Sequence, residues 1–365
     1  MTARVAPLGS TLASSLRLWS ALLRKPAPGR PVKVTAIVTE RCHLRCDFCR
    51  LWEAPDAGAA TRDWIAFFRA NPFLRWVNLS GGELFAKEDL GELLRAIIAA
   101  LPRLELLDFP TAGQRPDEVV AAAELLLATR LPRLAITVSL DGGPALHDRL
   151  RGVPGAFERA FETFEKLRRL QRSSGKNGAR LLVVAGCTLT SDALEQQRSL
   201  VAELTRRLPD FAPSELHFNL AHHSSHYYRN TAFSELPDES ALQVLENAAR
   251  PGGALGWIER SYARLARRAR SEGHPPIGCD ALARTVFDGP SFMVHPCTIW
   301  EQPLGNLRDF GLSLERLLTQ PAAQRARATI EQRACPGCFS PCEAVPALLA
   351  HPVKTLFASR GSRGA

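Results

Sequence analysis

Short apolar runs alternate with longer amphipathic stretches through the first two thirds of the chain. Each apolar run predicts a buried strand, and each following stretch repeats its apolar positions at helical spacing. The predicted strands are 34–39, 76–79, 104–109, 134–140, 180–185 and 215–220, and the predicted helices after the first five are 61–70, 87–101, 116–130, 156–171 and 191–207. Regular alternation of strand and helix predicts an α/β fold with a parallel sheet.

Six strand–helix repeats predict a partial (β/α)6 barrel, similar to a TIM barrel with strands missing. We expect three parts: an amphipathic helix and linker over 1–31, the barrel over 32–235, and a helical linker with a small cysteine-bearing region over 236–365. Arginines interrupt the apolar positions of the first helix, so it does not read as a signal peptide. We expect it to pack on the barrel or between two copies, with contact to a membrane surface as the alternative.

Composition limits the class of protein further. The chain has 365 residues, is 45% hydrophobic and carries a net charge of +9, with arginines spread along it. We therefore expect no nucleic-acid partner. Eight of the nine cysteines fall in two groups, which favours metal or cluster binding over disulfides and predicts a reducing, cytoplasmic location. No apolar run approaches the ~20 residues of a membrane-spanning helix.

The first group of cysteines comes directly after the first predicted strand. Cys42, Cys46 and Cys49 have the spacing C-x3-C-x2-C. Thiolates this close suit zinc or an iron–sulfur cluster. A structural zinc site needs four protein ligands, and no fourth cysteine lies nearby. Three thiolates on a four-iron cluster would leave one iron open to a small molecule. A zinc knuckle, or three unrelated core thiols, is the simpler alternative.

With the aromatic Phe48 before its last cysteine, this motif resembles that of the radical S-adenosylmethionine (SAM) enzymes. One strand later comes Ser80-Gly81-Gly82-Glu83, which is similar to the family's Gly-Gly-Glu segment. The resemblance implies a [4Fe-4S] cluster on Cys42, Cys46 and Cys49 that binds SAM and cleaves it to a 5′-deoxyadenosyl radical. It also implies that Gly81, Gly82 and Glu83 hold the amino group of SAM.

A segment after the fourth strand strengthens this resemblance, because it is similar to radical SAM proteins that carry a C-terminal SPASM or twitch extension. There the resemblance implies that Ser139 bonds the SAM ribose and that Arg151 pairs with its carboxylate. The backbone near Thr188 and Leu189 would flank the adenine. Family members often have Asn at the position of Ala112, so any polar contact from that position is in doubt.

Three further residues are candidates for catalysis. Asp141 follows the fourth strand, although it would serve equally to brace the next helix. Cys187 lies outside both cysteine groups; its thiol would suit hydrogen-atom donation to a substrate radical, and the simpler interpretation is a small buried core residue. His222 belongs to a histidine-rich loop, 221–229, where we expect contacts with substrate rather than a metal.

The second group of cysteines lies near the C-terminus. Its members are Cys279, Cys297, Cys335, Cys338 and Cys342. Asp288-Gly289 between the first two predicts a β-hairpin. The set resembles the auxiliary-cluster region of SPASM and twitch proteins, of which the full SPASM form has seven cysteines. Five imply one auxiliary [4Fe-4S] cluster and a spare thiol among Cys335, Cys338 and Cys342. The alternative is a structural zinc site.

Taken with the motifs, these features predict a radical SAM enzyme that abstracts a hydrogen atom from its substrate. We expect the substrate to be a ribosomally synthesised peptide, with oxidation or dehydrogenation of a small biosynthetic intermediate as the alternative. A cluster-bearing scaffold without catalysis is the second alternative. The expected partners are a flavodoxin- or ferredoxin-like electron donor and, since no peptide-binding domain is seen before Val32, a separate protein that binds the leader peptide.

Overall fold

The computed structural model describes residues 9–54, 58–248 and 252–360. Its strands form one nine-stranded sheet in the order β6-β5-β4-β3-β2-β1-β7-β8-β9. The strands are β1 (Lys33–Thr39), β2 (Trp76–Gly81), β3 (Leu106–Thr111), β4 (Leu134–Ser139), β5 (Leu181–Leu189), β6 (Leu216–Leu220), β7 (Thr285–Asp288), β8 (Met293–His295) and β9 (Gly305–Asn306). Strands β1 to β6 are parallel and adjacent in chain order, which confirms the predicted α/β fold.

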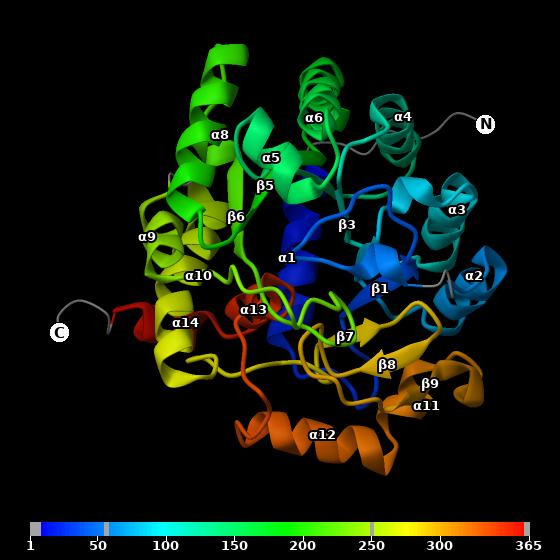
Figure 1. Cartoon of the computed structure of the whole chain (residues 1–365). Helices are drawn as coiled ribbons and strands as arrows, with labels where there is room; N and C mark the ends of the chain where they lie inside the picture. Colours follow the sequence, from blue (N-terminus) through cyan, green and yellow to red (C-terminus); the bar gives the residue numbers. More distant parts are fainter. Residues whose placement is uncertain (1–8, 55–57, 249–251, 361–365) are drawn as a thin grey trace.

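Helices follow the strands along the outer face of this sheet (Figure 1). They are α2 (Thr61–Ala70), α3 (Leu90–Ala100), α4 (Pro116–Leu127), α5 (Pro144–Arg151), α6 (Ala156–Ser173), α7 (Gly175–Gly178) and α8 (Ala193–Arg207). Short 3-10 turns η1 (Leu51–Glu53), η2 (Leu84–Ala86) and η3 (Pro213–Glu215) fill the connections. Each strand predicted from the apolar pattern is present within a few residues, and β5 runs four residues further than predicted.

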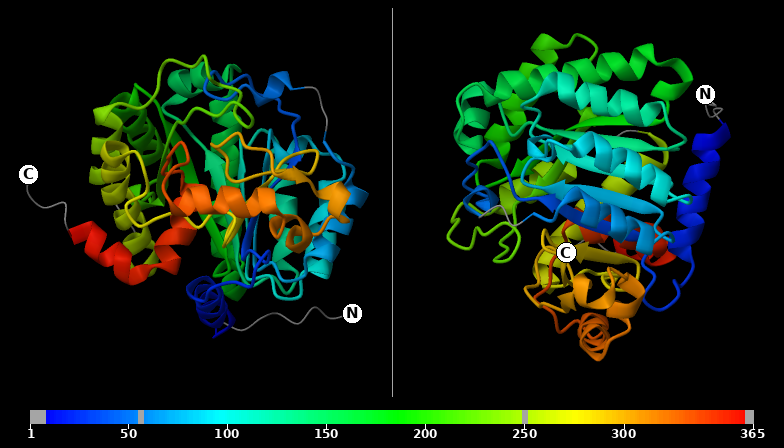
Figure 2. Two further views of the ribbon diagram at one scale, coloured as in Figure 1. Left: turned by 90° about the horizontal axis from the view of Figure 1, so that it is seen from below. Right: turned by 90° about the vertical axis from the view of Figure 1, so that its right-hand side faces the viewer.

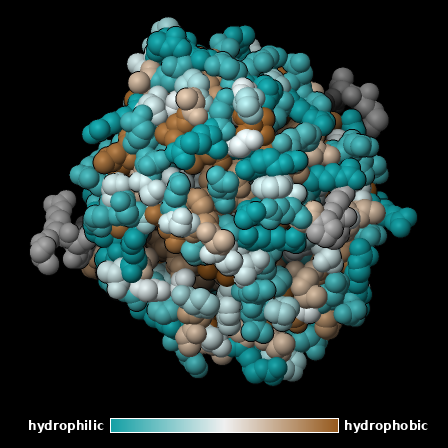
Figure 3. Space-filling model, viewed as in Figure 1, coloured by the Kyte–Doolittle hydropathy of each residue, from teal (hydrophilic) through white to brown (hydrophobic). Residues whose placement is uncertain are grey.

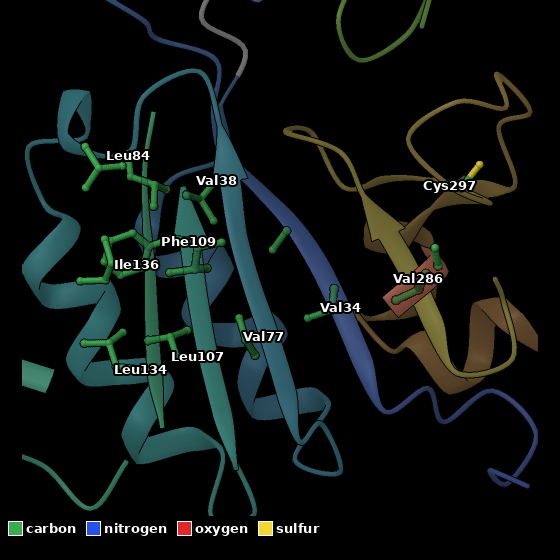
Figure 4. Packing of buried hydrophobic residues seen from close by; sticks show 14 of the residues in the cluster. Val34, Val38, Val77, Leu84, Leu107, Phe109, Leu134, Ile136, Val286 and Cys297 are labelled. Atoms are coloured by element: carbon green, nitrogen blue, oxygen red, sulfur yellow. The ribbon is translucent and has the colours of Figure 1, made fainter. Parts of the chain in front are cut away.

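Alternation along the strands gives the sheet two different faces. The outer face is apolar and packs on the helices; Figure 4 shows Leu107 beside Leu134 and Phe109 beside Ile136, which are partners in the β3–β4 register. The inner face carries polar side chains at the alternate positions. The polar inner-face residues that line a common cavity include Thr35, Asn78, Ser80, Asp108, Thr137, Ser139, Thr188, His217 and Asn219. A polar inner face is what a binding site needs.

The C-terminal region adds to the same sheet. Strand β7 pairs in parallel with β1, and β8 returns antiparallel to β7, which confirms the predicted hairpin at Asp288-Gly289. Around it lie α9 (Glu239–Asn247), α10 (Gly253–Glu272), η4 (Leu307–Phe310), α11 (Leu314–Leu318), α12 (Pro321–Glu331), α13 (Pro341–Ala350) and α14 (Pro352–Arg360). Figure 2 shows this region, yellow to red, against one side of the parallel sheet.

The N-terminal helix α1 (Gly9–Leu23) closes the opposite end of the molecule from the cysteine loop. Trp19 Nε1 donates to the carbonyl of Leu349 on α13 at 3.0 Å, so the helix packs on the fold as expected. Residues 1–8 of the part expected over 1–31 lie outside the described residues. Among the residues described, no helix is long and apolar enough to cross a membrane. The boundaries expected at 31 and 235 stay predictions.

Candidate SAM and iron–sulfur site

The three clustered cysteines lie on the loop that leaves β1, at the carboxyl edge of the parallel strands. Cys42, Cys46 and Cys49 line one cavity of about 320 Å³ against the inner face of the sheet. Of the other residues singled out from the sequence, those that line it are Phe48, Gly81, Gly82, Glu83, Ser139, Arg151, His222 and Cys342. Residues as far apart in the sequence as Thr35 and Cys342 therefore line the same cavity. Figure 3 shows the face of Figure 1 as mostly hydrophilic, with hydrophobic residues exposed near its middle.

The thiols of this loop are held close together and away from water. Burial raises the pKa of Cys42 to about 11 and that of Cys49 to about 12, and the Cys46 thiol raises the pKa of both further. Among the described residues, no three His, Cys, Asp or Glu side chains come together as ligands of a metal ion. A four-iron cluster does not require the three thiols to meet at one metal ion, because each thiolate binds a different iron. Binding it would release the thiol protons.

Arg151 sits beside this loop with its guanidinium buried. Its Nε donates to Asp141 Oδ2 at 2.5 Å, and Nη1 lies 3.8 Å from Cys46 Sγ. The guanidinium carbon lies 5.2 Å from the centre of the Phe48 ring. Nearby Asp141 raises the pKa of Arg151 further above its usual value despite burial. The site thus presents a fixed cation next to the cysteine loop.

Asp141 itself does not line the cavity. Its side chain is fully buried, and Oδ1 accepts from the Thr188 backbone N–H at 2.7 Å. Its own N–H donates to His147 Nδ1 at 3.0 Å. With both carboxylate oxygens engaged, Asp141 orients Arg151 and the end of β5 rather than facing a substrate.

The glycines of Ser80–Glu83 allow the backbone at the end of β2 to pass close to the backbone at Thr39 and Arg41. A Cβ on Gly81 (φ +145°) would lie 2.1 Å from the Thr39 carbonyl oxygen, and one on Gly82 would lie 2.3 Å from that of Arg41. The Gly82 and Glu83 N–H groups donate to these same two carbonyls at 3.0 and 2.7 Å. The sequence suggested close approach to a ligand; the structure shows that the glycines also fasten the second strand to the cysteine loop.

Glu83 is buried and its carboxylate is held by three donors. These are the backbone N–H groups of Phe85 and Ala112, at 3.3 and 2.6 Å, and the Thr111 hydroxyl at 2.8 Å. Burial nevertheless raises its pKa above the ordinary value. The contact that Ala112 makes here uses its backbone, so the missing side-chain amide at this position does not remove it.

Two candidates lie elsewhere. Cys187 and Leu189 are fully buried in the outer hydrophobic core, because Gly186 and Thr188 take the inward positions of β5. The Cys187 thiol has Gln196 Nε2 at 4.0 Å and a pKa raised by burial. Cys187 therefore does not reach the cavity, which agrees with its simpler interpretation as a buried core residue, and the backbone near Leu189 is what remains available to a ligand.

His222 lies on the cavity wall. Its Nε2 is buried without a hydrogen-bond partner, and burial lowers its pKa to about 4, so the ring is neutral. The neighbouring Asn219 Oδ1 on β6 is also buried without a partner. His223 bonds instead to the Phe233 carbonyl at 2.7 Å, and His226 to that of Cys297 at 3.1 Å. The three histidines thus face different surroundings.

The loop that carries these histidines, residues 221–230, is here called the bridging loop. On one side Asn230 Nδ2 donates to the Phe48 carbonyl at 2.8 Å, within the first cysteine loop. On the other side Ser224 Oγ donates to the Thr298 carbonyl at 2.6 Å, next to Cys297. In the middle the Tyr227 hydroxyl bonds Ser80 Oγ at 2.8 Å. The bridging loop thus connects the two cysteine-bearing regions.

The five C-terminal cysteines separate into a group of four and one. Cys297 and Cys338 are free thiols that interact by a side-chain hydrogen bond, and Cys297 also acts electrostatically on Cys279. Cys279 and Cys335 line a second hollow together. Cys342 instead lines the cavity of Cys42, Cys46 and Cys49. Cys342 thus stands apart from the other four.

Sequence reasoning missed several cavity residues. They are Asn78, Asp108, Thr137, His217 and Asn219 on the strands, and Tyr227 and Tyr228 on the bridging loop. The signal was present in the strands, because each of the five is a polar residue at an inward, alternate position of an otherwise apolar run. The tyrosines follow the last parallel strand, and no local pattern says that this segment folds back over the cavity.

Three curated proteins are similar to a part of this chain. The chain is 27% identical over 142 residues to the sporulation killing factor maturation protein SkfB of Bacillus subtilis, covering 38% of this chain and 33% of that protein. It is 36% identical over 141 residues to the AdoMet-dependent heme synthase of Methanosarcina barkeri, covering 36% and 38%. It is 25% identical over 144 residues to the subtilosin biosynthesis protein AlbA of Bacillus subtilis, covering 38% and 30%. The chain thus spans about a third of each relative's length, and no protein-family model matches it.

Solved structures extend the likeness to most of the chain. Native anSMEcpe with bound AdoMet superposes with a TM-score of 0.55 at 14% identity, covering 90% of this chain and 99% of that one. Streptococcus suis SuiB bound to S-adenosylmethionine superposes with a TM-score of 0.52 at 15% identity, covering 82% and 68%. Both solved structures contain bound AdoMet, and this chain has their fold.

Proposed function

We propose that this protein is a radical SAM enzyme. The observation that carries the proposal is the convergence of three thiols, a buried arginine and a buried glutamate on one cavity. Three soft ligands on one loop fit a [4Fe-4S] cluster with an open iron. A bound cluster and SAM would supply a 5′-deoxyadenosyl radical that removes a hydrogen atom from the substrate. The inner face of the sheet keeps that reaction away from bulk water.

The residues around the cavity fit the parts of SAM. The Arg151 guanidinium suits the carboxylate, because its planar fork binds such a group bidentately. The Gly81–Glu83 segment suits the ammonium group, and Ser139 suits the ribose hydroxyls. Thr188 at the inward end of β5, rather than the buried Leu189 side chain, suits the adenine edge. Asp141 is a positioning residue that holds Arg151 in place.

For the auxiliary [4Fe-4S] cluster we propose four thiolate ligands from the C-terminal group. They are Cys279, Cys297, Cys335 and Cys338. The Cys297–Cys338 side-chain contact and the shared hollow of Cys279 and Cys335 support this set. Cys279 precedes and Cys297 follows the β7–β8 hairpin, so the cluster would also fasten the segment before helix α13 to the sheet.

A ribosomally synthesised peptide is the substrate class that we favour. SkfB and AlbA are named for the maturation of a killing factor and the biosynthesis of a bacteriocin, and SuiB has been solved bound to the precursor peptide SuiA. A flavodoxin- or ferredoxin-like protein would supply the electron, and a separate protein would bind the leader peptide. The likeness to the AdoMet-dependent heme synthase keeps a small-molecule intermediate as the second candidate.

The test is iron and sulfide per chain after anaerobic reconstitution. We expect about eight irons, as two four-iron clusters require. The triple variant Cys42→Ala/Cys46→Ala/Cys49→Ala should keep about four, and Cys279→Ala/Cys297→Ala should keep the other four. Cys187→Ala is the matched control, since this thiol is buried in the apolar core, and it should keep about eight. Full iron in the triple variant would overturn the proposal.

A further inference from the structure

We propose that Cys342 is a catalytic thiol of the SAM cavity, which delivers a hydrogen atom to a carbon-centred radical formed there. The inference rests on the proposed function and specifies what happens to the substrate. A hydrogen atom returned to the substrate radical forms a new C–H bond in place of the one that was broken, so the substrate is not oxidised. Inversion of a stereocentre is the reaction class that fits. The role assigns to Cys342 what the sequence suggested for Cys187.

Cys342 is positioned apart from the auxiliary thiols. Of the described residues, no other cysteine is among the groups that act electrostatically on Cys342, which are Lys33, Glu343 and Asp108, whereas Cys297 has Cys338 as a side-chain partner. Glu343 is shared, since it also acts on Cys279 and Cys297. Lys33 is buried and its Nζ donates to the Cys342 carbonyl at 2.7 Å. That bond ties the start of α13 to β1, next to Cys342.

The thiol and the cluster loop share one cavity. Cys342 lines it together with Ser340, Pro341 and the three cysteines of the first group. Tyr227 and Tyr228 line the same cavity, and Cys49 and Cys342 both act electrostatically on each of them. Among the described residues, the lining of this cavity contains no thiol other than Cys342 and the three proposed cluster ligands.

A second observation marks this cavity as built for a ligand. His222 Nε2 and Asn219 Oδ1 both lie on its wall, buried and without a hydrogen-bond partner. A buried polar atom without a partner costs free energy, which a bound molecule recovers by forming a hydrogen bond to it. A neutral His222 suits a peptide amide, as it either donates or accepts. These groups would hold a substrate within the same space as the Cys342 thiol.

The chemistry balances with one electron and one proton. The S–H bond of Cys342 breaks homolytically, and its hydrogen atom forms a C–H bond with the carbon radical. The sulfur radical left behind takes one electron and one proton and becomes a thiol again. We assign the electron to the reduced auxiliary cluster and the proton to solvent. S–H bonds are weaker than aliphatic C–H bonds, so the transfer runs toward the new C–H bond.

Iron content tests whether Cys342 is free of the auxiliary cluster, and the measurement needs no turnover. Reconstituted Cys342→Ser should keep the iron and sulfide of the wild type, whereas Cys338→Ser should lose about half, as one of two four-iron clusters. Cys342→Ala, which keeps no polar group, guards against an effect of the serine hydroxyl. Loss of half the iron from both Cys342 variants would make Cys342 a cluster ligand and overturn the inference.

Deuterium transfer tests whether the Cys342 thiol donates a hydrogen atom, with SAM as the only substrate. Reduced holoenzyme in D₂O should give 5′-deoxyadenosine that carries one deuterium, because the exchanged Cys342 S–D bond quenches the radical. The deuterated fraction should fall at least tenfold in Cys342→Ser and stay unchanged in Cys187→Ala. Deuterium that persists in Cys342→Ser, or is absent from the wild type, overturns the inference. No 5′-deoxyadenosine from any of the proteins would instead overturn the proposed function and, with it, this inference.

Discussion

Arg151 Nε donates to Asp141 Oδ2 at 2.5 Å, and both side chains are buried beside the cysteine loop. The pair joins the end of β4 to the end of α5. A buried charge that loses its partner is expensive, because water no longer solvates it. The pair therefore holds the Arg151 guanidinium at the place where we propose that it binds the carboxylate of SAM.

Replacing Asp141 by Asn tests this arrangement. We expect Asp141→Asn to lower the free energy of unfolding by about 3–5 kcal/mol, as for a broken buried pair. SAM binding should weaken as well, since Arg151 loses its orientation. Chemical denaturation and equilibrium dialysis of SAM measure the two effects. In the exposed pair of Arg149 and Asp192, Arg149→Ala is the control and should cost less than about 1 kcal/mol. Equal losses in both variants would contradict the account.

Gly81 is expected to tolerate no side chain. A Cβ there would lie 2.1 Å from the Thr39 carbonyl oxygen and would push β2 away from the start of the cysteine loop. We expect Gly81→Ala to lose most of the iron of the first cluster on reconstitution. Gly175 has a positive φ of +52° but nothing within 4 Å of its added Cβ, so Gly175→Ala should cost only about 1–2 kcal/mol of backbone strain and keep its iron. Full iron in Gly81→Ala would show that the loop moves freely.

The bridging loop should be coupled energetically to the second strand. Ser80 Oγ and the Tyr227 hydroxyl are 2.8 Å apart in a buried site. We expect Tyr227→Phe and Ser80→Ala each to lower stability by about 1 kcal/mol. Because each removes the same bond, the double variant should lose less than the sum of the two, by at least about 0.5 kcal/mol. Strict additivity in urea denaturation would mean that the hydrogen bond contributes nothing.

His147 should make the fold sensitive to acid. It is fully buried, and burial lowers its pKa from 6.5 to about 4. In the unfolded chain it takes up a proton as pH falls below 6.5, while the folded protein does not, so stability present above pH 6.5 is lost progressively toward pH 4. Linkage gives a loss of about 1 kcal/mol at pH 5.5 relative to pH 7.5.

His147→Asn isolates that effect. Asparagine keeps an acceptor for the Asp141 N–H but has no proton to bind. The difference in unfolding free energy between pH 7.5 and 5.5 should therefore be smaller in the variant by about 1 kcal/mol. All other histidines are shared by the two proteins and cancel. An unchanged difference would place the pKa of His147 near its ordinary value.

Much of the fold was predictable from local pattern. Each parallel strand was found because its core-facing residues are apolar, as in the run from Val34 to Thr39, and a βα repeat leaves few other topologies. The Asp288-Gly289 turn similarly predicted its hairpin. The helices α11 to α14 were not predicted, since short helices tied to a cysteine-bearing region carry little periodicity.

The site was predictable for residues that belong to a known motif. It was not predictable for residues whose position depends on how distant segments pack together. Cys42, Cys46, Glu83 and Arg151 converge as their motifs imply. The sequence left Cys187 open between a catalytic thiol and a core residue; the core position follows because β5 continues through it, and each residue of a strand turns its side chain to the opposite face from the one before. No spacing rule separates Cys342 from Cys338; only the path of the chain into α13 directs it to the other cavity.

Reductive cleavage of SAM tests the central claim most directly. Reconstituted protein, dithionite-reduced under anaerobic conditions, should convert SAM to 5′-deoxyadenosine and methionine in equal amounts. The variant Cys42→Ala/Cys46→Ala/Cys49→Ala should give only background, while Cys279→Ala/Cys297→Ala should retain some cleavage through its intact first cysteine loop. Background levels in the wild type with its full iron content would contradict the account and leave a cluster-bearing scaffold in its place.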